Sequence, residues 1–404
     1  MQNLYFCAEY KIGLEMDKLY EFYHKKLSET PLEFTRYKYR EIKWQGRMLG
    51  VVGPRGVGKT TMLLQRIKRE EDINDTLYVS ADHLYFADHS LLDVADSFSK
   101  SGKRNLYIDE IHKYHGWSQE LKQIYDSYSD LRVVFTGSSI LDIYKGISDL
   151  SRRSPIYEMQ GFSFREYLLL FHNIEVQTYT LEEILNHKAI IPGVKHPLPL
   201  FKSYLQSGYY PFSSDPDFDI ELQQIITQTM EVDIPQYAGM NVSIGHKLKQ
   251  LLVFIAKSVP FKPVYQKLAT VINTSRNNIP DYLYYMERAG MIASLQDHTG
   301  GIRGLGKTEK LYLDNPNLIY ALSPQNAETG NVRETFFLNQ MRVRYPITSS
   351  SISDFQIDGK TFEVGGKNKG QRQIAESKEG YVVKDDIEFG HDNVIPLWSF
   401  GLTY

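Results

Sequence analysis

The sequence predicts an α/β protein whose N-terminal part is a parallel sheet with helices on both faces. Short apolar runs alternate with helical segments between residues 48 and 139, and this alternation is typical of strands joined by crossover helices. The apolar runs are also short and contain few charged residues, which fits strands that are covered on both faces.

Each expected element has its own local pattern. MLGVV at residues 48–52 is an apolar run that ends at a Gly-Pro turn. Further strands are expected at residues 77–81, 105–109 and 131–139. Helical periodicity predicts helices at residues 17–29, 59–70, 90–101 and 117–128.

The pattern changes after about residue 160. The next stretch, residues 180–300, is mainly helical, and short strands return from residue 311 together with one helix at 331–343. The chain length of 404 residues is enough for two or three domains. We therefore predict three parts, with the bounds 1–175, 176–300 and 301–404.

Composition and charge exclude several classes of protein. The net charge of −3 and the pI of about 6.4 argue against a general nucleic-acid coat, which needs a basic excess. No apolar run approaches the ~18 residues of a membrane span, so no membrane contact is expected. The single cysteine, Cys7, cannot form an internal disulfide, and a cytoplasmic location is expected.

GPRGVGKT at residues 53–60 has the spacing of a phosphate-binding P-loop. Its glycines let the backbone curl, so that N–H groups point at the phosphates, and the following helix directs its positive end at the same anion. Lys59 reaches the β and γ phosphates, and Thr60 offers a hydroxyl to Mg²⁺. The residues predicted to bind the nucleotide are Gly53, Pro54, Arg55, Gly56, Val57, Gly58, Lys59, Thr60 and Thr61.

A second segment, GIRGLGKT at residues 301–308, matches the same pattern. It is followed by EKLYLDNPN, which alternates like a strand, so no helix terminus faces a phosphate there. We interpret this segment as a glycine-rich loop and not as a second nucleotide site.

NLYIDEIH at residues 105–112 is an apolar strand that ends in Asp-Glu, like a Walker B motif. Asp109 is predicted to hold Mg²⁺ together with Thr60. Glu110 is predicted to orient or deprotonate the attacking water. The alternative is an acidic turn after a strand, but the pairing with a P-loop about fifty residues earlier favours hydrolysis of a nucleoside triphosphate.

Two further segments supply candidate catalytic residues. The strand VVFTGSS at 133–139 is expected between the first strand and the Asp-Glu strand, where Ser138 or Ser139 would contact the γ-phosphate or the water. Arg152 and Arg153 are candidates to stabilise the transition-state charge on their own nucleotide, or on that of a neighbour in a homo-oligomer. A Gly-Ser turn and a solvated basic pair are the respective alternatives.

The ordered set of motifs resembles a prokaryotic group of AAA-family P-loop ATPases that has an uncharacterised C-terminal half and is distantly similar to STAND-type signalling ATPases. The resemblance implies ATP with Mg²⁺, and it places Ser138 or Ser139 at the sensor position of AAA-type ATPases. The segments that carry it are GPRGVGKTT (53–61), LYIDEIHK (106–113), FTGSS (135–139), LSRR (150–153), GFSFREYL (161–168), SGYYPF (207–212), GNVRETFFLNQM (330–341), DFQIDGKTFEVGGKNK (354–369) and IPLWSFGLTY (395–404).

The middle part has the element order of a winged helix. Three helices and a strand are expected at 245–258, 264–272, 277–289 and 291–296. The third helix would read DNA if Arg276, Asn277, Asn278 and Arg288 faced the groove. Asp281 and Glu287 on the same helix argue against DNA, and a protein-interaction or lid role is favoured.

The last part resembles the PD-(D/E)XK nuclease layout, in which carboxylates hold a metal and a lysine steadies the attacking water. Glu334 lies on a helix, and Asp354 and Glu363 lie on consecutive strands. The usual lysine position holds Gly365, and Lys367, on the same strand face, is the candidate to replace it, with Lys369 as the weaker one. A degenerate scaffold is favoured over an active nuclease.

The resulting prediction is an enzyme that binds ATP and hydrolyses it with Mg²⁺ for an unknown conformational or partner-regulating task. Its first rival is a nucleotide-gated switch with little turnover. Its second rival is an ATP-dependent DNA-binding protein or nuclease.

Overall fold

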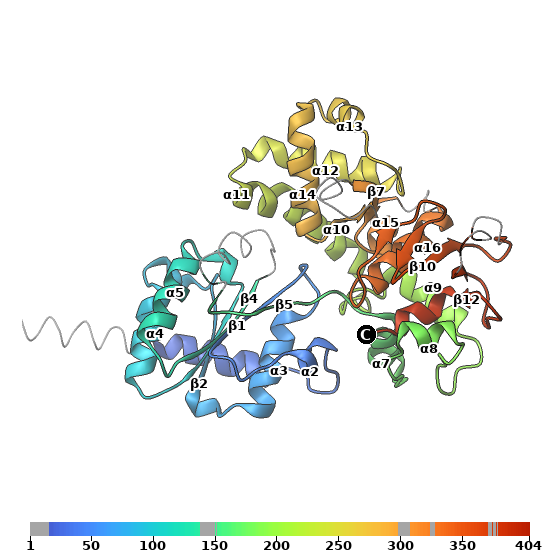
Figure 1. Cartoon of the computed structure of the whole chain (residues 1–404). Coiled ribbons are helices and arrows are strands. Elements are labelled where there is room, and N and C mark those ends of the chain that lie inside the picture. Colours follow the sequence, from blue (N-terminus) through green and yellow to red (C-terminus); the bar gives the residue numbers. More distant parts are fainter. Residues whose placement is uncertain are drawn as a thin grey trace, which may run out of the picture. The chain divides into compact units, whose positions relative to one another are not determined.

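The computed structural model describes residues 16–137, 150, 152–297, 308–323, 328–370, 374, 377 and 379–404. The chain divides into two compact units, Met1–Gln160 and Gly161–Tyr404. Figure 1 shows their helices and strands, coloured along the sequence. The sequence places the first boundary near residue 175. In the structure, the segment after Gly161 packs within the second unit, where the Ser163 hydroxyl donates to the carbonyl of Tyr404 (2.7 Å). The division into three parts stays a prediction.

The first unit is built on a five-stranded sheet in which every neighbouring pair of strands is parallel. The strand order is β2-β3-β4-β1-β5, so β4 lies between β1 and β3 as predicted. The strand bounds are β1 Met48–Val52, β2 Thr76–Ser80, β3 Asn105–Asp109, β4 Arg132–Gly137 and β5 Ile156–Glu158.

The strands of this sheet form where the sequence is apolar because helices cover both faces. All residues of β1 and β2 are buried. Gly50 in β1 is required by packing, since a Cβ there would lie 2.6 Å from the ring of Phe135 and 2.7 Å from Ile156. The helices of the unit are residues 16–28, α2 Lys38–Glu41, α3 Lys59–Glu70, α4 Leu91–Lys100 and α5 Trp117–Ser127.

The second unit begins with helices. Its helical bounds are α7 Phe164–His172, α8 Leu181–Leu185, α9 Leu198–Ser207, α10 Phe218–Gln228, a π-helical turn Thr229–Asp233, α11 Ile234–Ala238, α12 Val242–Ala256, α13 Tyr265–Val271 and α14 Ile279–Arg288. The hairpin of β6 (Ile292–Gln296) and β7 (Thr308–Leu313) follows. The element order α12-α13-α14-hairpin fits the predicted winged helix, which stays a prediction.

A second five-stranded sheet closes the chain. Its order is β12-β11-β10-β9-β8, with antiparallel pairing from β8 to β10 and parallel pairing from β10 to β12. The ring of Phe337 lies 5.1 Å from the ring of Phe355 and 5.5 Å from the ring of Phe362. These contacts pack the helix that carries Phe337 against the sheet. The bounds are α15 Pro316–Leu322, α16 Thr329–Met341, β8 Thr348–Ser349, β9 Phe355–Ile357, β10 Lys360–Gly365, β11 Gly380–Lys384 and β12 Val394–Pro396.

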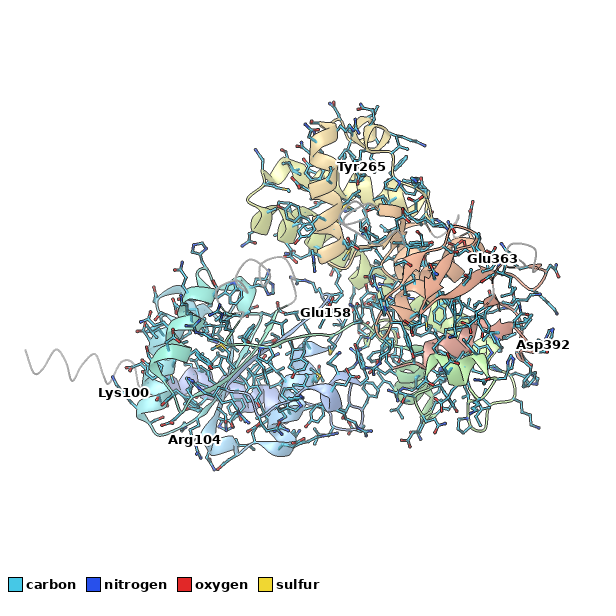
Figure 2. All side chains as sticks on the ribbon, in the orientation of Figure 1. Lys100, Arg104, Glu158, Tyr265, Glu363 and Asp392 are labelled. Atoms are coloured by element: carbon cyan, nitrogen blue, oxygen red, sulfur yellow. The ribbon has the colours of Figure 1, made fainter. Side chains whose placement is uncertain are left out.

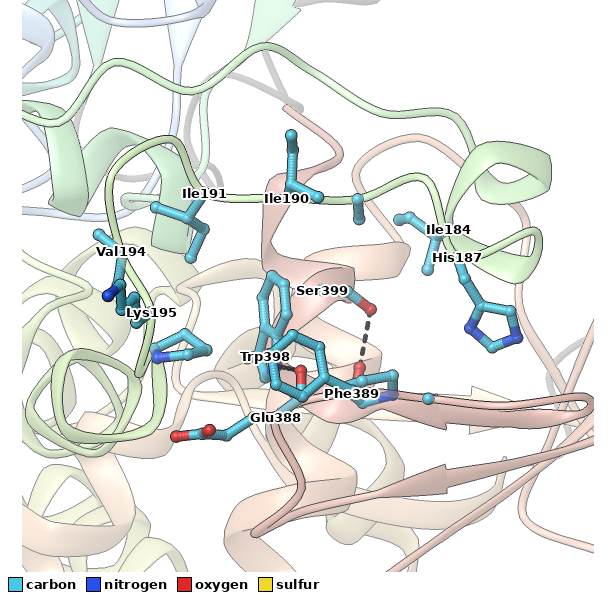
Figure 3. Close-up of a pocket in the computed structure, with 14 residues that line it drawn as sticks. Ile184, His187, Ile190, Ile191, Val194, Lys195, Glu388, Phe389, Trp398 and Ser399 are labelled. Carbon is cyan, nitrogen blue, oxygen red and sulfur yellow. Dashed lines mark hydrogen bonds between the residues drawn. The ribbon is translucent and has the colours of Figure 1, made fainter.

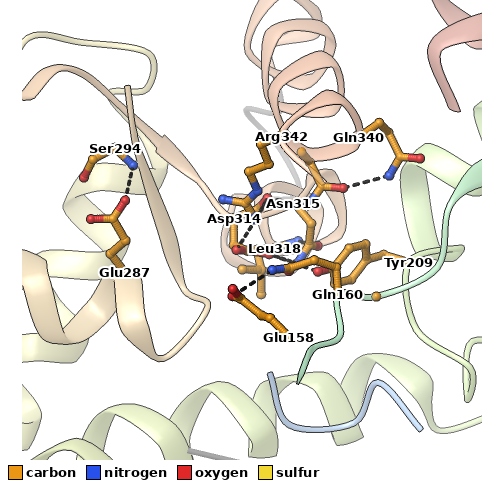
Figure 4. A network of polar contacts seen from close by, with 12 residues as sticks. Glu158, Gln160, Tyr209, Glu287, Ser294, Asp314, Asn315, Leu318, Gln340 and Arg342 are labelled. Carbon is orange, nitrogen blue, oxygen red and sulfur yellow. Dashed lines mark hydrogen bonds and ion pairs between the residues drawn. The ribbon is translucent and has the colours of Figure 1, made fainter. Parts of the chain in front are cut away.

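A buried polar network joins distant segments of the second unit (Figure 4). Asp314 pairs with Arg342, the residue that directly follows α16, and accepts a hydrogen bond from the Tyr209 hydroxyl (3.2 Å). Its carbonyl also accepts from the side-chain amide of Asn339 (2.8 Å). Because these groups satisfy one another away from water, the network fixes the predicted SGYYPF segment against α16.

Among the described residues, no helix has the length and apolar character that a membrane crossing requires.

Candidate functional site

The P-loop lies between the end of β1 at Val52 and the start of α3 at Lys59. Gly56 has φ 82° and Gly58 has φ 91°, a left-handed conformation that favours glycine. These two residues turn the chain so that α3 begins directly at the lysine, and its N-terminal N–H groups face the loop. The structure thus gives residues 53–60 the conformational context that the sequence predicts.

Lys59 is buried, with 4% of the residue exposed. Its ammonium donates to the carbonyls of Gly53 (2.9 Å) and Pro54 (2.8 Å) within the loop. Burial lowers its pKa to about 8, although the carboxylates of Glu110 and Asp109 act in the opposite direction. The lysine is therefore held inside the loop on weak, neutral acceptors, which a phosphate can replace.

The lowered pKa of Lys59 predicts that nucleotide affinity depends on pH. A bound triphosphate favours the ammonium and raises its pKa, so binding is strongest below about pH 8 and weakens above it, by up to about tenfold per pH unit. Calorimetric titration of Mg–ATP between pH 7 and pH 9.5 measures this. Lys59→Arg keeps its charge in this range and should give a flat profile. Equal affinity of the unaltered protein at pH 7 and pH 9 would contradict the prediction.

Asp109, at the end of β3, is buried and accepts hydrogen bonds from three hydroxyl groups. These are Thr60 Oγ1 (2.7 Å), the Tyr78 hydroxyl (2.9 Å) and Thr136 Oγ1. Burial raises the pKa of Asp109, and the nearby Glu110 raises it further. Because Thr60 donates its proton to Asp109, its oxygen keeps its lone pairs for a cation. The structure therefore brings together the two predicted magnesium ligands.

Glu110 has a left-handed backbone, with φ 50° and ψ 38°. Its N–H donates to Thr136 Oγ1 (3.2 Å), and its carboxylate lies 3.3 Å from Nε2 of the buried His112. A non-glycine residue in this region costs ~1–2 kcal/mol, and such residues concentrate at functional sites. The carboxylate is thus held by specific contacts at the same strand end as Asp109.

The sequence analysis missed several residues of this site. Thr136 is a hydroxyl residue near the end of β4, two positions before Ser138, so the signal was present in FTGSS. Tyr78 and His112 gave no local signal, and neither did Arg36. The Arg36 guanidinium donates to the carbonyl of Val57 in the P-loop from a position 21 residues earlier.

The structure does not bring the remaining catalytic candidates of the first unit into described contact with the P-loop. Ser138 and Ser139 lie outside the described residues. Arg153 forms a two-fold ion pair with Asp126 of α5, with N–O distances of 2.9 and 3.0 Å, and Arg152 is exposed. Their roles at a nucleotide stay predictions.

In the second segment with the P-loop pattern, residues 301–308, Thr308 opens strand β7 and not a helix, as the sequence predicts.

Two of the nuclease-like carboxylates share one lysine. The ammonium of Lys310, on β7, lies 3.0 Å from Asp354 Oδ1 and 3.5 Å from Glu334 Oε2. The Tyr312 hydroxyl also donates to Glu334 (2.9 Å). Burial and the charge of Asp354 raise the pKa of Glu334 to about 7, while Lys310 opposes the shift. The two carboxylates therefore already share one cation, which the sequence analysis did not include.

The prediction that Lys367 serves the third carboxylate is wrong. Strand β10 ends at Gly365, so the alternation of side chains stops there, and Lys367 is exposed on the turn that follows. Lys369, the weaker candidate, instead forms the ion pair with Glu363. Glu363 is labelled in Figure 2. Among the described residues, no group of three or more carboxylate, histidine or cysteine side chains is arranged to hold a metal ion.

The second unit also contains a cavity of about 180 Å³, shown in Figure 3. It is lined by the 184–197 segment and by residues between Glu388 and Ser399, including the largely exposed Phe389 and the Trp398 ring. No residue of the P-loop lines it.

Comparisons with known protein families agree with a P-loop site in the first unit. Residues 45–168 match the family model described as the AAA domain. The N-terminal half carries an AAA-type P-loop ATPase domain. Residues 198–329 match a domain of unknown function, DUF8612.

Two curated relatives come from Methanocaldococcus jannaschii. The uncharacterized protein MJ1637 is 26% identical over 338 residues, which are 73% of this chain and 70% of that protein. The uncharacterized protein MJ1544 is 23% identical over 358 residues, which are 83% of this chain and 76% of that protein.

The chain is also similar to solved structures. The Walker-type ATPase PABY2304 of Pyrococcus abyssi is 12% identical, with a TM-score of 0.38 over 75% of this chain and 95% of that one. A variant of RuvB from Thermotoga maritima is 17% identical, with a TM-score of 0.28 over 68% of this chain and 89% of that one.

Proposed function

We propose that the first unit binds ATP with Mg²⁺ at residues 53–61 and hydrolyses its terminal phosphoanhydride bond. The observation that carries this proposal is the hydrogen bond of 2.7 Å between Thr60 and Asp109, next to the buried Lys59. It joins the start of α3 to the end of β3, and so combines a phosphate cradle with a buried carboxylate. The AAA domain match over residues 45–168 supports the same function.

The residues present fit a magnesium ion. Thr60 and Asp109 supply hard oxygen donors, and Mg²⁺ at such sites takes one or two protein oxygens and completes its shell with phosphates and water. When bound, the ion neutralises charge on the β and γ phosphates.

The protein groups then have separate tasks. Lys59 exchanges the carbonyls of Gly53 and Pro54 for phosphate oxygens, and the loop N–H groups hold the β phosphate. Glu110 accepts a proton from, or orients, the water that attacks the γ phosphorus. We propose that the resulting nucleotide cycle drives a conformational or partner-regulating task, with a protein as the partner.

Steady-state phosphate release tests the activity. The unaltered protein with ATP and Mg²⁺ should release phosphate, and chelation of the metal should stop release. Tight ATP binding without turnover under any metal condition would instead support the nucleotide-gated switch.

One observation supports DNA cleavage by the second unit, and another argues against it. Phe355 pairs with Phe362 across β9 and β10, so Asp354 and Glu363 lie opposite each other on one face. Lys310 and Lys369 neutralise both carboxylates, which favours the degenerate scaffold. Incubation with plasmid and Mg²⁺ or Mn²⁺, with Asp354→Ala as the control, tests this alternative. Intact plasmid under all conditions would exclude it.

DNA contact by the helical region also stays a prediction. Arg276, Asn277 and Asn278 are exposed in a short 3₁₀ turn before α14, and Arg288 lies over the ring of Tyr284. An arginine that acts on a neighbour's nucleotide would need a homo-oligomer, which mass measurement with and without nucleotide tests.

A further inference from the structure

The segment that ends the first unit lies directly against the P-loop. The N–H of Met159 donates to the carbonyl of Val52 (2.8 Å), the last residue before the loop. A Cβ placed on Gly53 would lie only 2.1 Å from the carbonyl oxygen of Met159. Gly53 is therefore needed for this close approach, and the two backbones have no free space between them.

Arg36 links the P-loop to the segment that ends the first unit through its side chain. This residue is 4% exposed, and its two terminal nitrogens donate to two backbone carbonyls. One acceptor is Val57, which lies between the left-handed residues Gly56 and Gly58, and the other is Gln160 (2.7 Å). A planar guanidinium that holds two acceptors fixes the distance between them. The middle of the P-loop is thus linked to the last residue of the first unit.

The next residues along the chain are fixed equally firmly, but within the second unit. The N–H of Phe162 donates to the carbonyl of Tyr209 (2.8 Å), and the Tyr204 hydroxyl donates to the carbonyl of Phe162 (2.6 Å). Gly161 packs against the Tyr209 ring, where a Cβ would lie 2.3 Å away. The covalent junction between residues 160 and 161 consequently joins two anchored ends without an intervening linker.

We infer that Arg36 is a positioning residue that couples the nucleotide state of the P-loop to the second unit. A P-loop that closes on phosphates must turn its peptide groups, including the one at Val57. Arg36 transmits this movement to the carbonyl of Gln160, and the anchored Gly161 and Phe162 receive it. This inference rests on the proposed nucleotide binding and adds the route by which it reaches the rest of the chain.

Hydrogen exchange of the full-length protein with and without Mg–ATP tests the inference. In the unaltered protein, saturating nucleotide should change exchange in residues 158–165. Arg36→Met should still bind Mg–ATP, about tenfold more weakly, but should lose the change at 161–165. Arg47→Met is the matched control, because Arg47 also donates to two carbonyls, those of Tyr125 and Tyr128, and it should keep the full change.

The outcomes separate the inference from the function on which it rests. If nucleotide binds the unaltered protein but exchange at 158–165 stays the same, or if Arg36→Met keeps the change, the coupling role is wrong and ATP binding stands. If Mg–ATP does not bind at all, both proposals fail. Should Arg36→Met not fold, Arg36→Lys serves instead, since its single nitrogen replaces the two terminal nitrogens of the planar guanidinium, which hold the two carbonyls at a fixed spacing. It should bind Mg–ATP with a reduced change at 161–165, and a full change would overturn the inference.

Discussion

Glu110→Gln is expected to lower the rate of ATP hydrolysis by about 10³-fold, while the Kd for Mg–ATP changes by less than about threefold. The amide has the shape of the carboxylate but cannot accept a proton from water at neutral pH. Binding is preserved because Lys59, Thr60 and Asp109 are untouched. Single-turnover phosphate release and titration with a fluorescent ATP analogue measure the two quantities separately.

A matched variant controls for the loss of one negative charge. Glu29→Gln makes the same chemical change on an exposed residue outside the proposed nucleotide site, and it should hydrolyse ATP at the normal rate. A Glu110→Gln protein that turns over ATP as fast as the unaltered chain would show that another group activates the water. His112, 3.3 Å from the Glu110 carboxylate, would then be the first residue to replace.

The sequence predicted the first unit well because its signals are local. The run 105–109 is a strand in the structure with the same bounds, and α3 spans the predicted 59–70. In a parallel sheet the carboxyl ends of the strands share one edge, so the loop after β1 and the acidic pair at the end of β3 lie at the same edge, with only β4 between their strands. The contact between Thr60 and Asp109 follows from that topology.

Arg36 was out of reach for the opposite reason. Its acceptors are backbone carbonyls 21 and 124 residues away, and any residue type supplies a carbonyl. Nothing in the sequence of Val57 or Gln160 therefore marks them as partners. Such links are decided by tertiary packing, which local patterns do not contain.

The lysines of the second unit show a third kind of limit. Lys367 was chosen by strand alternation, which is valid only while the strand continues, and β10 ends two residues earlier at Gly365. Lys310 comes from β7, and it meets Asp354 across 44 residues of sequence. Strand ends and long-range ion pairs both depend on the folded chain. The sequence therefore ranked Lys369, the partner of Glu363, below Lys367, and it gave no sign of Lys310.

Asp109→Asn is expected to abolish function and yet raise the thermal stability of the first unit. Burial and Glu110 raise the pKa of Asp109 in the folded state above that of the unfolded chain. Its charge therefore destabilises the fold once the pH rises through the folded-state pKa, and this effect is absent below the unfolded value of ~3.9. Mg²⁺-dependent hydrolysis should fall at least ~100-fold, since one of the two proposed magnesium ligands is lost.

The hydrogen bonds of Asp109 permit this substitution. The amide oxygen of asparagine accepts from hydroxyls as the carboxylate does, and its NH₂ group donates to a hydroxyl oxygen of Thr60, Tyr78 or Thr136. Thermal unfolding at pH 7 should give a higher Tm for Asp109→Asn than for the unaltered protein, and the difference should shrink as the pH approaches 4.

Asp109→Ala separates charge from hydrogen bonding. It removes the same charge but leaves the three buried hydroxyls without their shared acceptor, and each unsatisfied buried group costs ~1–3 kcal/mol. This variant should therefore melt below the unaltered protein at pH 7. If Asp109→Asn also melts lower at pH 7, the buried carboxylate stabilises the fold. That result would contradict the prediction that the carboxylate is kept for the proposed metal at a cost in stability.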